Sequence, residues 1–340
     1  MTGVGGTTVL GSGVAAAACA LFAARHGPVT LAGAAPPGRA TAVESVPAAT
    51  LTLLLELGVV PRELDVPGLV RGRTVTWERT EPEHHDGPAC AHVDRSALLH
   101  ALWRRVEADA LIAVVPRITG QAAPPGRLVD ATGARARTAV SVTRRPGAWT
   151  AATVTLARKD ADPGLRLAAA PEGYGYRLGS ASLVTLGWVG PGRPPRDGPA
   201  LWRRIQSNCA WLLTGLPEPP REATYRRPAG LALPVAAESV VPIGDAALTR
   251  DALASQGTSI ALSDACLAAD PRVTDAKLAV RRADARERHV RHLDETLAAC
   301  GYSAEPTWES YRRWLGQITS GPAVALSHPR WAGRYGARSS

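Results

Sequence analysis

The sequence predicts an α/β protein: a parallel-sheet domain, interrupted by a second, mostly antiparallel sheet and followed by a C-terminal helical region. Three observations support this. A strand, a glycine turn, an Ala-rich helix and a second strand follow one another near the N-terminus. Apolar runs separated by Pro/Gly loops occupy the middle of the chain, and residues 276–298 predict a charged helix. The expected domains are residues 1–137 with 232–275, residues 138–231, and residues 276–340.

The N-terminal unit is predicted from local signals. Apolar runs at 7–10 and 29–32 predict buried strands, and the Ala-rich stretch 14–25 predicts a helix between them. The segment His26-Gly27-Pro28 is expected to stop this helix, because proline cannot continue the helical hydrogen-bond ladder.

The later elements follow the same logic. A Leu-rich helix is expected over 51–57, ended by Gly58, and another over 96–106, capped by Asp94. Further strands are expected at 127–130, 139–142, 152–156, 181–189 and 240–243.

Composition and charge exclude several classes of protein. Of 340 residues, 45% are apolar and 20% charged, which is ordinary for a folded protein, and no apolar run is long enough to span a membrane. The net charge of +9 favours an anionic partner, but the basic residues are scattered and form no nucleic-acid-binding module. Five cysteines without a CxxC pair or a Cys/His cluster predict reduced thiols, no metal site and a cytoplasmic protein.

The segment Gly11-Ser12-Gly13-Val14-Ala15-Ala16 matches the pattern G-x-G-x-x-G/A, after a strand and at the start of a helix. In this pattern the first glycine makes a tight turn, the second lets a pyrophosphate approach the backbone, and the last position allows close packing. The N–H groups at the helix N-terminus then bind the phosphates. The sequence therefore predicts a Rossmann-like cofactor-binding turn that uses Gly11, Gly13 and Ala16.

One position departs from this pattern. An acidic residue usually ends the second strand and binds the ribose hydroxyls. Here that position is Gly33, and no Asp or Glu precedes Glu44. Arg39 or main-chain groups are therefore expected to hold the adenosine end. Cofactor affinity should be modest, and Gly33→Glu is expected to raise it.

A second motif, Gly244-Asp245-Ala246, follows a strand far along the chain, and Ser255-Gln256-Gly257 precedes an Ala-rich helix. Paired with the N-terminal turn, it resembles the FAD-dependent monooxygenase superfamily, whose FAD-binding domain is of the glutathione-reductase type. The resemblance implies FAD as cofactor and Asp245 as the residue that binds its ribityl chain. It also implies that the following turn lies against the pyrophosphate and the isoalloxazine ring, which adds these cofactor-binding residues: Gly244, Ser255, Gln256 and Gly257.

Three further segments carry the resemblance. Val93-Asp94-Arg95 resembles the segment whose arginine sits beside the flavin, and residues 128–133 resemble the "DATG" strand end. Glu44-Ser45-Val46-Pro47 resembles the GES-x-P turn of tryptophan-halogenase-like flavoproteins. Over residues 5–275, order and spacing look most like the branch that hydroxylates peptidyl tryptophan during tryptophylquinone cofactor maturation.

The resemblance implies a monooxygenase that hydroxylates an aromatic ring, with tryptophan in a peptide or protein as favoured substrate. NAD(P)H or a partner flavin reductase would reduce the FAD, and the positive charge suits an acidic leader peptide. Two alternatives stay open: a non-catalytic binding partner with a flavoprotein fold, and an FAD-dependent oxidase or dehydrogenase. Halogenation is disfavoured, because halogenases of this superfamily need a lysine and the first lysine here is Lys159.

The catalytic candidates are Glu44 and His92. The motif places Glu44 at the flavin, although a loop carboxylate paired with an arginine fits the sequence equally well. His92 precedes the Val-Asp-Arg segment and is either a base or a half-buried structural residue. Four aromatic residues could stack on an aromatic substrate or pack in the core: Trp77, Tyr174, Tyr176 and Trp188.

Overall fold

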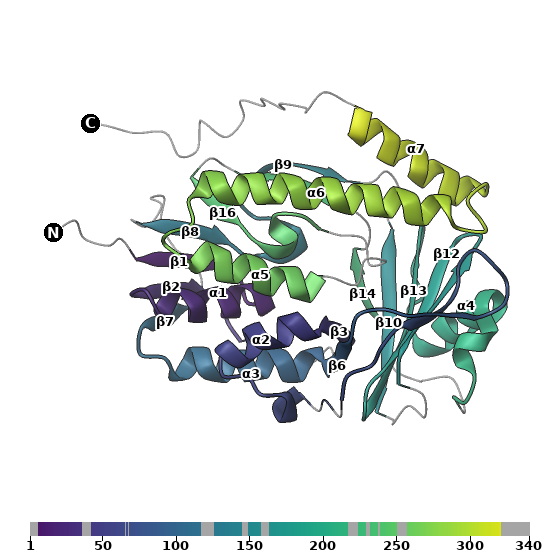
Figure 1. Ribbon diagram of the computed structural model, residues 1–340, viewed down its shortest axis with the longest axis horizontal. Coiled ribbons are helices and arrows are strands. Elements are labelled where there is room, and N and C mark those ends of the chain that lie inside the picture. Colours follow the sequence, from purple (N-terminus) through teal and green to yellow (C-terminus); the bar gives the residue numbers. More distant parts are fainter. Residues whose placement is uncertain are drawn as a thin grey trace.

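The computed structural model describes residues 6–35, 42–64, 66, 68–116, 126–144, 149–157, 163–216, 224–228, 232–236, 239–249 and 257–320. It contains two main sheets, a small ladder of β3 (Val43–Pro47) and β6 (Cys90–Asp94) between them, and a long helix that passes along both (Figure 1). This arrangement is the predicted fold class: a parallel α/β unit, an inserted sheet and C-terminal helices.

The first sheet has five parallel strands in the order β16-β8-β1-β2-β7. Val9 pairs with Leu31 on one side and Val129 on the other, and all three side chains are buried. Because the strands are parallel, their carboxyl ends and the loops that follow them share one edge. The strands of this first sheet are β1 (Thr7–Leu10), β2 (Val29–Ala32), β7 (Ile112–Val115), β8 (Arg127–Asp130) and β16 (Val240–Pro242).

Small side chains decide how helices cover this sheet. Ten of the eleven residues of α1 (Val14–Ala24) are buried, and its alanines let α5 (Gly257–Ala269) pack closely against it. The predicted helix signals are confirmed for α2 (Ala48–Glu56) and α3 (Arg95–Ala108). Gly58 follows α2 with a φ of +76°, and the Asp94 carboxylate accepts a hydrogen bond from the Ser96 N–H at 2.8 Å.

The second sheet has seven strands in the order β14-β10-β13-β12-β11-β4-β5. All neighbours are antiparallel except β11 and β4, which run parallel. Within the described residues, the predicted strand at 139–142 exists as β9 (Ala139–Arg144), but it pairs with β15 (Ala232–Ala236) and not with this sheet. The sheet's strands are β4 (Arg73–Thr76), β5 (Glu83–His85), β10 (Thr150–Ala157), β11 (Leu165–Ala170), β12 (Gly173–Gly179), β13 (Leu183–Gly190) and β14 (Tyr225–Pro228).

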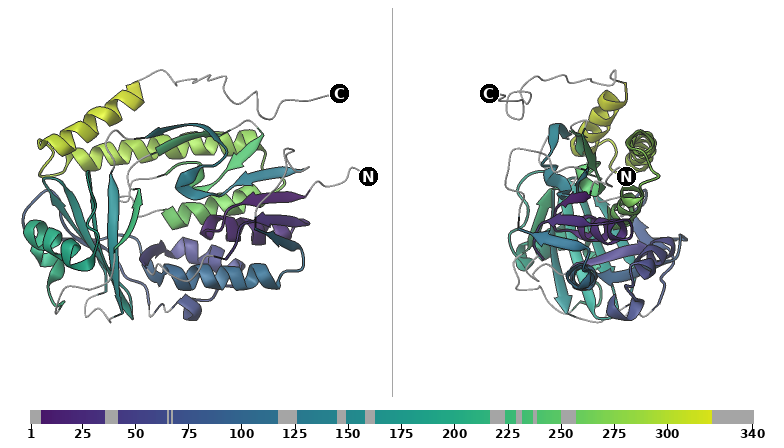
Figure 2. Two further views of the ribbon diagram at one scale, coloured as in Figure 1. Left: turned by 180° about the vertical axis from the view of Figure 1, so that it is seen from behind. Right: turned by 90° about the vertical axis from the view of Figure 1, so that its left-hand side faces the viewer.

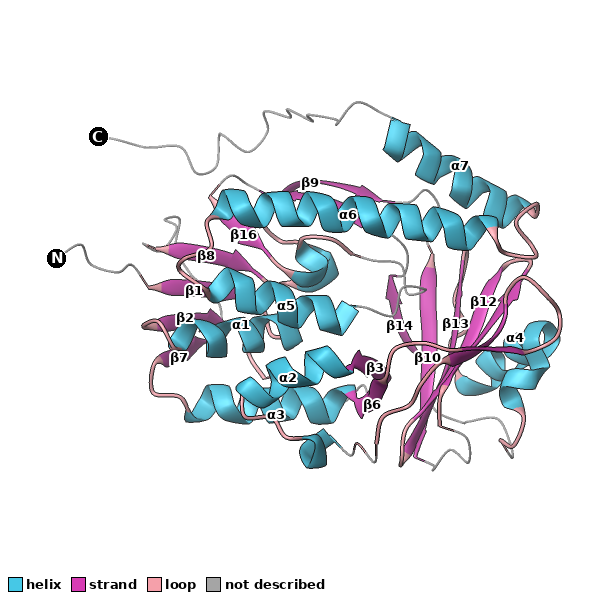
Figure 3. Ribbon diagram, in the orientation of Figure 1, coloured by secondary structure: helices cyan, strands magenta, loops and turns pink. Residues whose placement is uncertain are grey.

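Helices α6 (Asp275–Ala298) and α7 (Pro306–Ser320) join the two parts (Figures 2 and 3). Leu278, near the start of α6, packs in the core of the first sheet, whereas Leu293 and Leu297 pack in a core beside the second sheet. Trp308 of α7 is fully buried there, and its indole Nε1 donates to the Ala170 carbonyl at 2.8 Å. The opposite face of the second sheet is covered by α4 (Gly198–Cys209) and the short helix η3 (Ala210–Leu213).

The described ranges hold neither a membrane-spanning helix nor a cluster of metal ligands. None of the helices there combines the length and the hydropathy needed to cross a membrane. No three His, Cys, Asp or Glu side chains in those ranges are grouped as a metal site requires. All five cysteines are free thiols.

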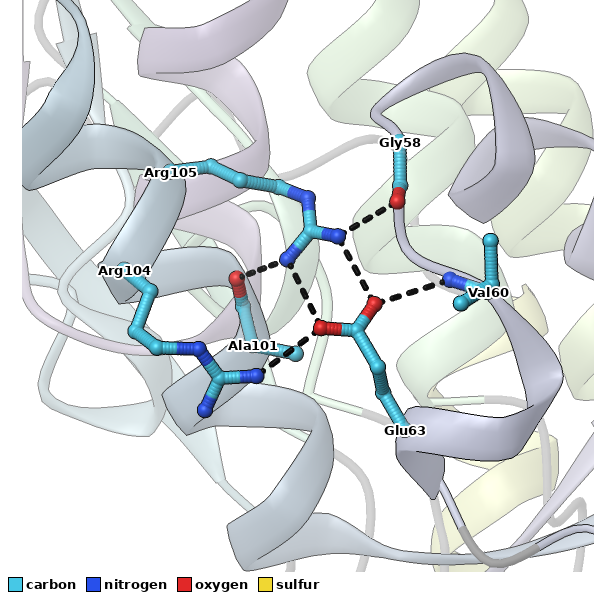
Figure 4. A network of polar contacts seen from close by, with 6 residues as sticks. All are labelled: Gly58, Val60, Glu63, Ala101, Arg104 and Arg105. Atoms are coloured by element: carbon cyan, nitrogen blue, oxygen red, sulfur yellow. Dashed lines mark hydrogen bonds and ion pairs between the residues drawn. The ribbon is translucent and has the colours of Figure 1, made fainter.

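A polar network joins the segment that follows α2 to helix α3 (Figure 4). The Glu63 carboxylate, on the short helix η1 (Pro61–Leu64), accepts hydrogen bonds from Arg105 at 2.7 Å, Arg104 at 2.9 Å and the Val60 N–H at 3.1 Å. Arg105 also donates to the carbonyl of Gly58. The Arg105 hydrogen bonds, with those from Val60 and Arg104, lower the pKa of Glu63 to about 2.

Replacing Glu63 by glutamine is expected to lower the free energy of unfolding at neutral pH by about 1 kcal/mol, because the charged acceptor is lost at a partly exposed site. For a chain of this size, the corresponding decrease in Tm is about 1.4 °C. Because the pKa is lower in the folded protein, the stabilisation is complete above the unfolded-state pKa and disappears as the pH falls towards 2. Thermal unfolding of both proteins from pH 7 to pH 3 measures this. A difference that grew on acidification would contradict it.

Candidate functional site

The turn after β1 requires glycine at its first position. Gly11 has a φ of +132°, and a Cβ placed there would lie 2.4 Å from the Ala131 carbonyl oxygen. The Gly11 N–H donates to the Ala32 carbonyl at 2.9 Å, and the indole Nε1 of Trp103 donates to the Ser12 carbonyl at 3.1 Å. The turn is therefore held from both the second strand and α3.

The N-terminus of α1 is open. Gly13 has an ordinary φ of −84°, and among the described residues no heavy atom beyond its chain neighbours lies within 4 Å of a Cβ built on it. No side chain in the described part of the molecule caps this helix, and its first turn has no acidic residue. The first N–H groups of a helix have no intrahelical acceptors, so this end is suited to an anion. Ala16 is fully buried below the turn, as the close-packing position requires.

Gly33 has a steric role that corrects one expectation. A Cβ at Gly33 would lie 2.1 Å from the Gly11 carbonyl oxygen, because the end of β2 lies directly against the turn. The Gly33 N–H is also bonded to the Val115 carbonyl at 2.8 Å, which fixes the backbone. Gly33→Glu would therefore displace the Gly11 turn, and the expectation that it would strengthen cofactor binding is wrong.

The second motif meets the first in space. Gly244 begins the short helix η4 (Gly244–Ala246) after β16 with a φ of +56°, and a Cβ there would touch Ala15 and Ala261 at 3.4 Å each. Its N–H donates to the Asp264 carboxylate of α5 at 3.0 Å. Asp245 is half-buried next to it. The two glycine-containing turns, far apart in sequence, thus adjoin at the carboxyl edge of the parallel sheet.

Asp130, in the 128–133 segment, organises the neighbouring strand end. Its buried carboxylate accepts hydrogen bonds from the N–H and hydroxyl groups of Thr132, at 2.8 and 2.6 Å. It also accepts hydrogen bonds from the N–H and hydroxyl groups of Thr138, at 3.0 and 2.6 Å. The Asp130 carbonyl accepts from the Ile243 N–H at 2.9 Å, which ties this loop to the turn at Gly244.

Glu44 connects three elements of the site. One carboxylate oxygen lies 3.0 Å from an Arg95 guanidinium nitrogen, and the other accepts a hydrogen bond from the Thr258 hydroxyl in the first turn of α5. Glu44 lies on β3 opposite Val93 of β6. Val93 and Asp94 lead directly into Arg95, the first residue of α3. The sequence predicted Glu44 and Arg95 separately. Thr258 was missed, and its position next to Gly257 was the signal that could have identified it.

His92 lies apart from this group. It is opposite Ser45 in the β3–β6 ladder, so its side chain points to the face opposite that of Glu44. Its Nδ1 lies 2.8 Å from the carbonyl oxygen of Gly179 on β12, and the residue is 4% exposed. Because a carbonyl only accepts, Nδ1 carries the proton. Burial lowers the pKa of His92, and the bond to Gly179 partly opposes that shift.

Several predicted residues fall outside the described ranges: Arg39, Ser255 and Gln256, together with Lys159. Gly257 is described and begins α5. The structure thus brings together Gly11, Gly13, Ala16 and Gly244 around one sheet edge, with Asp245 beside them, and it separates His92 from Glu44.

Comparisons with known proteins place this fold. No family model matches the sequence, and no curated protein matches it. Solved structures do match. One is the peptidyl tryptophan dihydroxylase QhpG, essential for tryptophylquinone cofactor biogenesis, with a TM-score of 0.68 and 19% identity over 91% of this chain and 78% of that one. The flavin-dependent halogenase CmlS gives 0.75 and 15% identity over 94% and 71%.

A third match is PqsL, a probable FAD-dependent monooxygenase from Pseudomonas aeruginosa, with a TM-score of 0.61 and 18% identity over 92% of this chain and 94% of that one. The chain therefore has the fold of FAD-dependent monooxygenases and halogenases, over more than nine-tenths of its length.

Proposed function

We propose that this protein is an FAD-dependent monooxygenase that hydroxylates an aromatic ring, with tryptophan in a peptide or protein as the favoured substrate. The observation that carries the proposal is the close approach of Gly244 to Ala15, where an added Cβ would lie 3.4 Å from the Ala15 Cβ, because it brings the two motifs together at one sheet edge. In parallel α/β sheets, ligands bind beyond the carboxyl ends of the strands. The likeness to QhpG supports the choice of tryptophan.

The residues present fit FAD. The uncapped N-terminus of α1 and the open space at Gly13 suit the pyrophosphate, since N–H donors and the helix dipole both favour negative charge there. Asp245 would hold the ribityl chain, and Arg95 would lie beside the flavin. When bound, FAD would supply the reduction of dioxygen and the transfer of one oxygen atom.

The chain's own residues would bind and orient. Glu44 has both carboxylate oxygens engaged, so it holds the Arg95 guanidinium and the first turn of α5 in a fixed relation. Asp130 holds the loop against the turn at Gly244. His92 fixes the β3–β6 ladder to the second sheet through Gly179. Contacts of this kind would hold the site residues in fixed positions relative to the cofactor and the substrate ring.

Purified protein tests the cofactor directly. We expect the purified protein to show the yellow absorption band of bound oxidised flavin, either as isolated or after reconstitution with FAD. Reduced by NAD(P)H or a flavin reductase, the protein should then increase the mass of a tryptophan-containing peptide by one oxygen atom. Colourless protein that FAD cannot reconstitute would instead favour the non-catalytic alternative, and loss of two hydrogens from the peptide would favour the oxidase.

We further expect no halogenation. The chain has two lysines, Lys159 and Lys277, and Lys277 is exposed at the start of α6. With chloride or bromide added to the reduced protein and a tryptophan peptide, mass spectrometry should find only oxygen addition. A halogenated indole would overturn the hydroxylase proposal, and Lys159→Met would then show whether that lysine is responsible.

A further inference from the structure

The second sheet presents two different faces. Leu186 and Trp188 of β13 point to the outer face, where they pack with residues of α4 and η3. Thr185, Gly187 and Val189 alternate with them and belong to the inner face. The inner face meets the β3–β6 ladder, because the Val43 N–H donates to the Thr185 hydroxyl at 2.8 Å. Since Glu44 follows Val43, the inner face is the one that lies next to the candidate site.

Three cross-strand rows run over the inner face of β10, β13 and β12. The row of Ala151, Val189 and Tyr174 is part of the buried core that also contains Trp308 of α7. The row of Thr155, Thr185 and Leu178 lies where β3 docks. Between them is a middle row formed by these three residues: Thr153, Gly187 and Tyr176.

Tyr176 owes its position in the middle row to Gly187. A Cβ at Gly187 would lie 2.2 Å from Cε1 and 2.3 Å from Cζ of Tyr176, so the ring lies over the glycine and occupies the space of the missing side chain. Tyr176 packs against the edge of the aromatic core and remains half-buried. The ring is thus positioned on the sheet, with part of its surface uncovered.

Burial separates the four aromatic residues that the sequence left undecided. Trp77, Tyr174 and Trp188 are 8%, 1% and 3% exposed and belong to the two cores beside the sheet. Tyr176 alone among the four is partly exposed. It is also the one whose row adjoins the contact with β3.

We infer that Tyr176, held over Gly187, is the residue that contacts an aromatic substrate ring and sets the preference of the site for it. This inference rests on the proposed function for the identity of the substrate. A tyrosine ring attracts another aromatic ring through offset or edge-to-face contacts, beyond the gain from buried area. A planar, apolar group such as an indole is therefore the class of ligand that this wall of the site would take.

Calorimetric titration of the protein with N-acetyltryptophan amide tests the inference. Tyr176→Phe keeps the ring and is expected to bind the amide within about twofold of wild type, whereas Tyr176→Leu keeps apolar bulk without a ring and should raise Kd about tenfold. Gly187→Ala leaves the tyrosine in the sequence but pushes its ring aside, and should raise Kd similarly.

Gly175→Ala is the matched control. Its Cβ would lie 2.7 Å from Cys209 Sγ and 2.9 Å from Leu212 Cδ1, two flexible side-chain ends that belong to the outer-face core. It therefore perturbs packing on the same sheet, one residue from Tyr176, while leaving the inner face intact. Its Kd should stay within about twofold of wild type even if its Tm falls.

Equal Kd values for wild type, Tyr176→Leu and Gly187→Ala would overturn the inference, and so would wild-type protein that binds no amide. An equal increase of Kd in Gly175→Ala would also overturn it, since general loosening of the sheet would then explain the effect. Binding of FAD is measured separately. Protein that binds the amide through Tyr176 but takes up no FAD would refute the proposed function and leave the aromatic site standing.

Discussion

Replacing Gly13 by aspartate is expected to remove FAD from a protein that still folds. The backbone of Gly13 has a φ of −84°, which any residue adopts, and no described residue beyond its chain neighbours comes within 4 Å of an added Cβ. Aspartate is moreover a favourable residue before the first turn of a helix, where it caps N–H groups and complements the dipole. Stability should therefore be kept or slightly raised.

The loss of FAD follows from charge. The new carboxylate would compete for the N–H groups proposed to bind the pyrophosphate, and it would repel the phosphates. Two like charges 4 Å apart repel by about 4 kcal/mol at the effective dielectric constant of a protein surface. The affinity for FAD should therefore fall by roughly a hundredfold or more.

Gly13→Asn separates charge from size in this experiment. It has nearly the same shape and also caps helices, but it carries no charge. The flavin absorbance per mole of protein, a titration with FAD and the Tm should be compared for all three proteins. Stoichiometric FAD in Gly13→Asp would show that the phosphates bind elsewhere, and equal loss in both variants would assign the effect to bulk.

The second large effect is expected from replacing Asp245 or Glu44. The two replacements should impair different steps: binding of FAD and transfer of oxygen. Asp245→Ala should lower FAD occupancy, because a carboxylate that binds a ribityl hydroxyl is lost and the ligand group is left unpaired. Asp245→Asn, which keeps hydrogen-bonding atoms at that position, should retain more FAD. Full occupancy in the alanine variant would contradict the role assigned to Asp245.

Glu44→Gln should keep FAD but slow oxygen transfer, and it should release hydrogen peroxide in place of hydroxylated product. Both carboxylate oxygens are engaged by Arg95 and Thr258, and the amide can no longer balance the charge of Arg95. A side chain that transfers a proton contributes about 10²–10⁴-fold to the rate.

The rate and its pH profile decide between the two roles of Glu44. A loss in that range, with a wild-type acidic limb that the glutamine variant lacks, would identify Glu44 as a proton carrier. A smaller loss with an unchanged profile would identify it as the residue that positions Arg95. Loss of FAD in Glu44→Gln would contradict its placement near the ring end of the cofactor.

Local sequence predicted most of the parallel-sheet unit, although not its edge strand β7. Strands β1 and β2 begin and end where the apolar runs do, and α1 ends one residue before the predicted limit. The reason is that each signal acts over a few residues: a glycine with positive φ at Gly11, a run of alanines, and a Gly-Pro stop. The turn at Gly244 was predictable for the same reason.

The second sheet was only partly predictable. The strands at 152–156 and 181–189 were found, but β9 was expected to belong with them and pairs with β15 instead. Strands β4 and β5 come from residues outside 138–231, yet they extend the sheet beyond β11. Strand pairing depends on partners distant in the sequence, and nothing within a short apolar run specifies which partner it will meet.

The roles of the candidate side chains were decided by the tertiary structure. The sequence identified Glu44 as chemically important, but its contact with Thr258 joins residues 214 positions apart. Gly33 looked like a missing acid and is a glycine because the Gly11 carbonyl lies against it. Tyr176 differs from Tyr174 only in the row of the sheet that it occupies. Local patterns fix the backbone of an element, whereas close approach, burial and pairing exist only after the elements pack together.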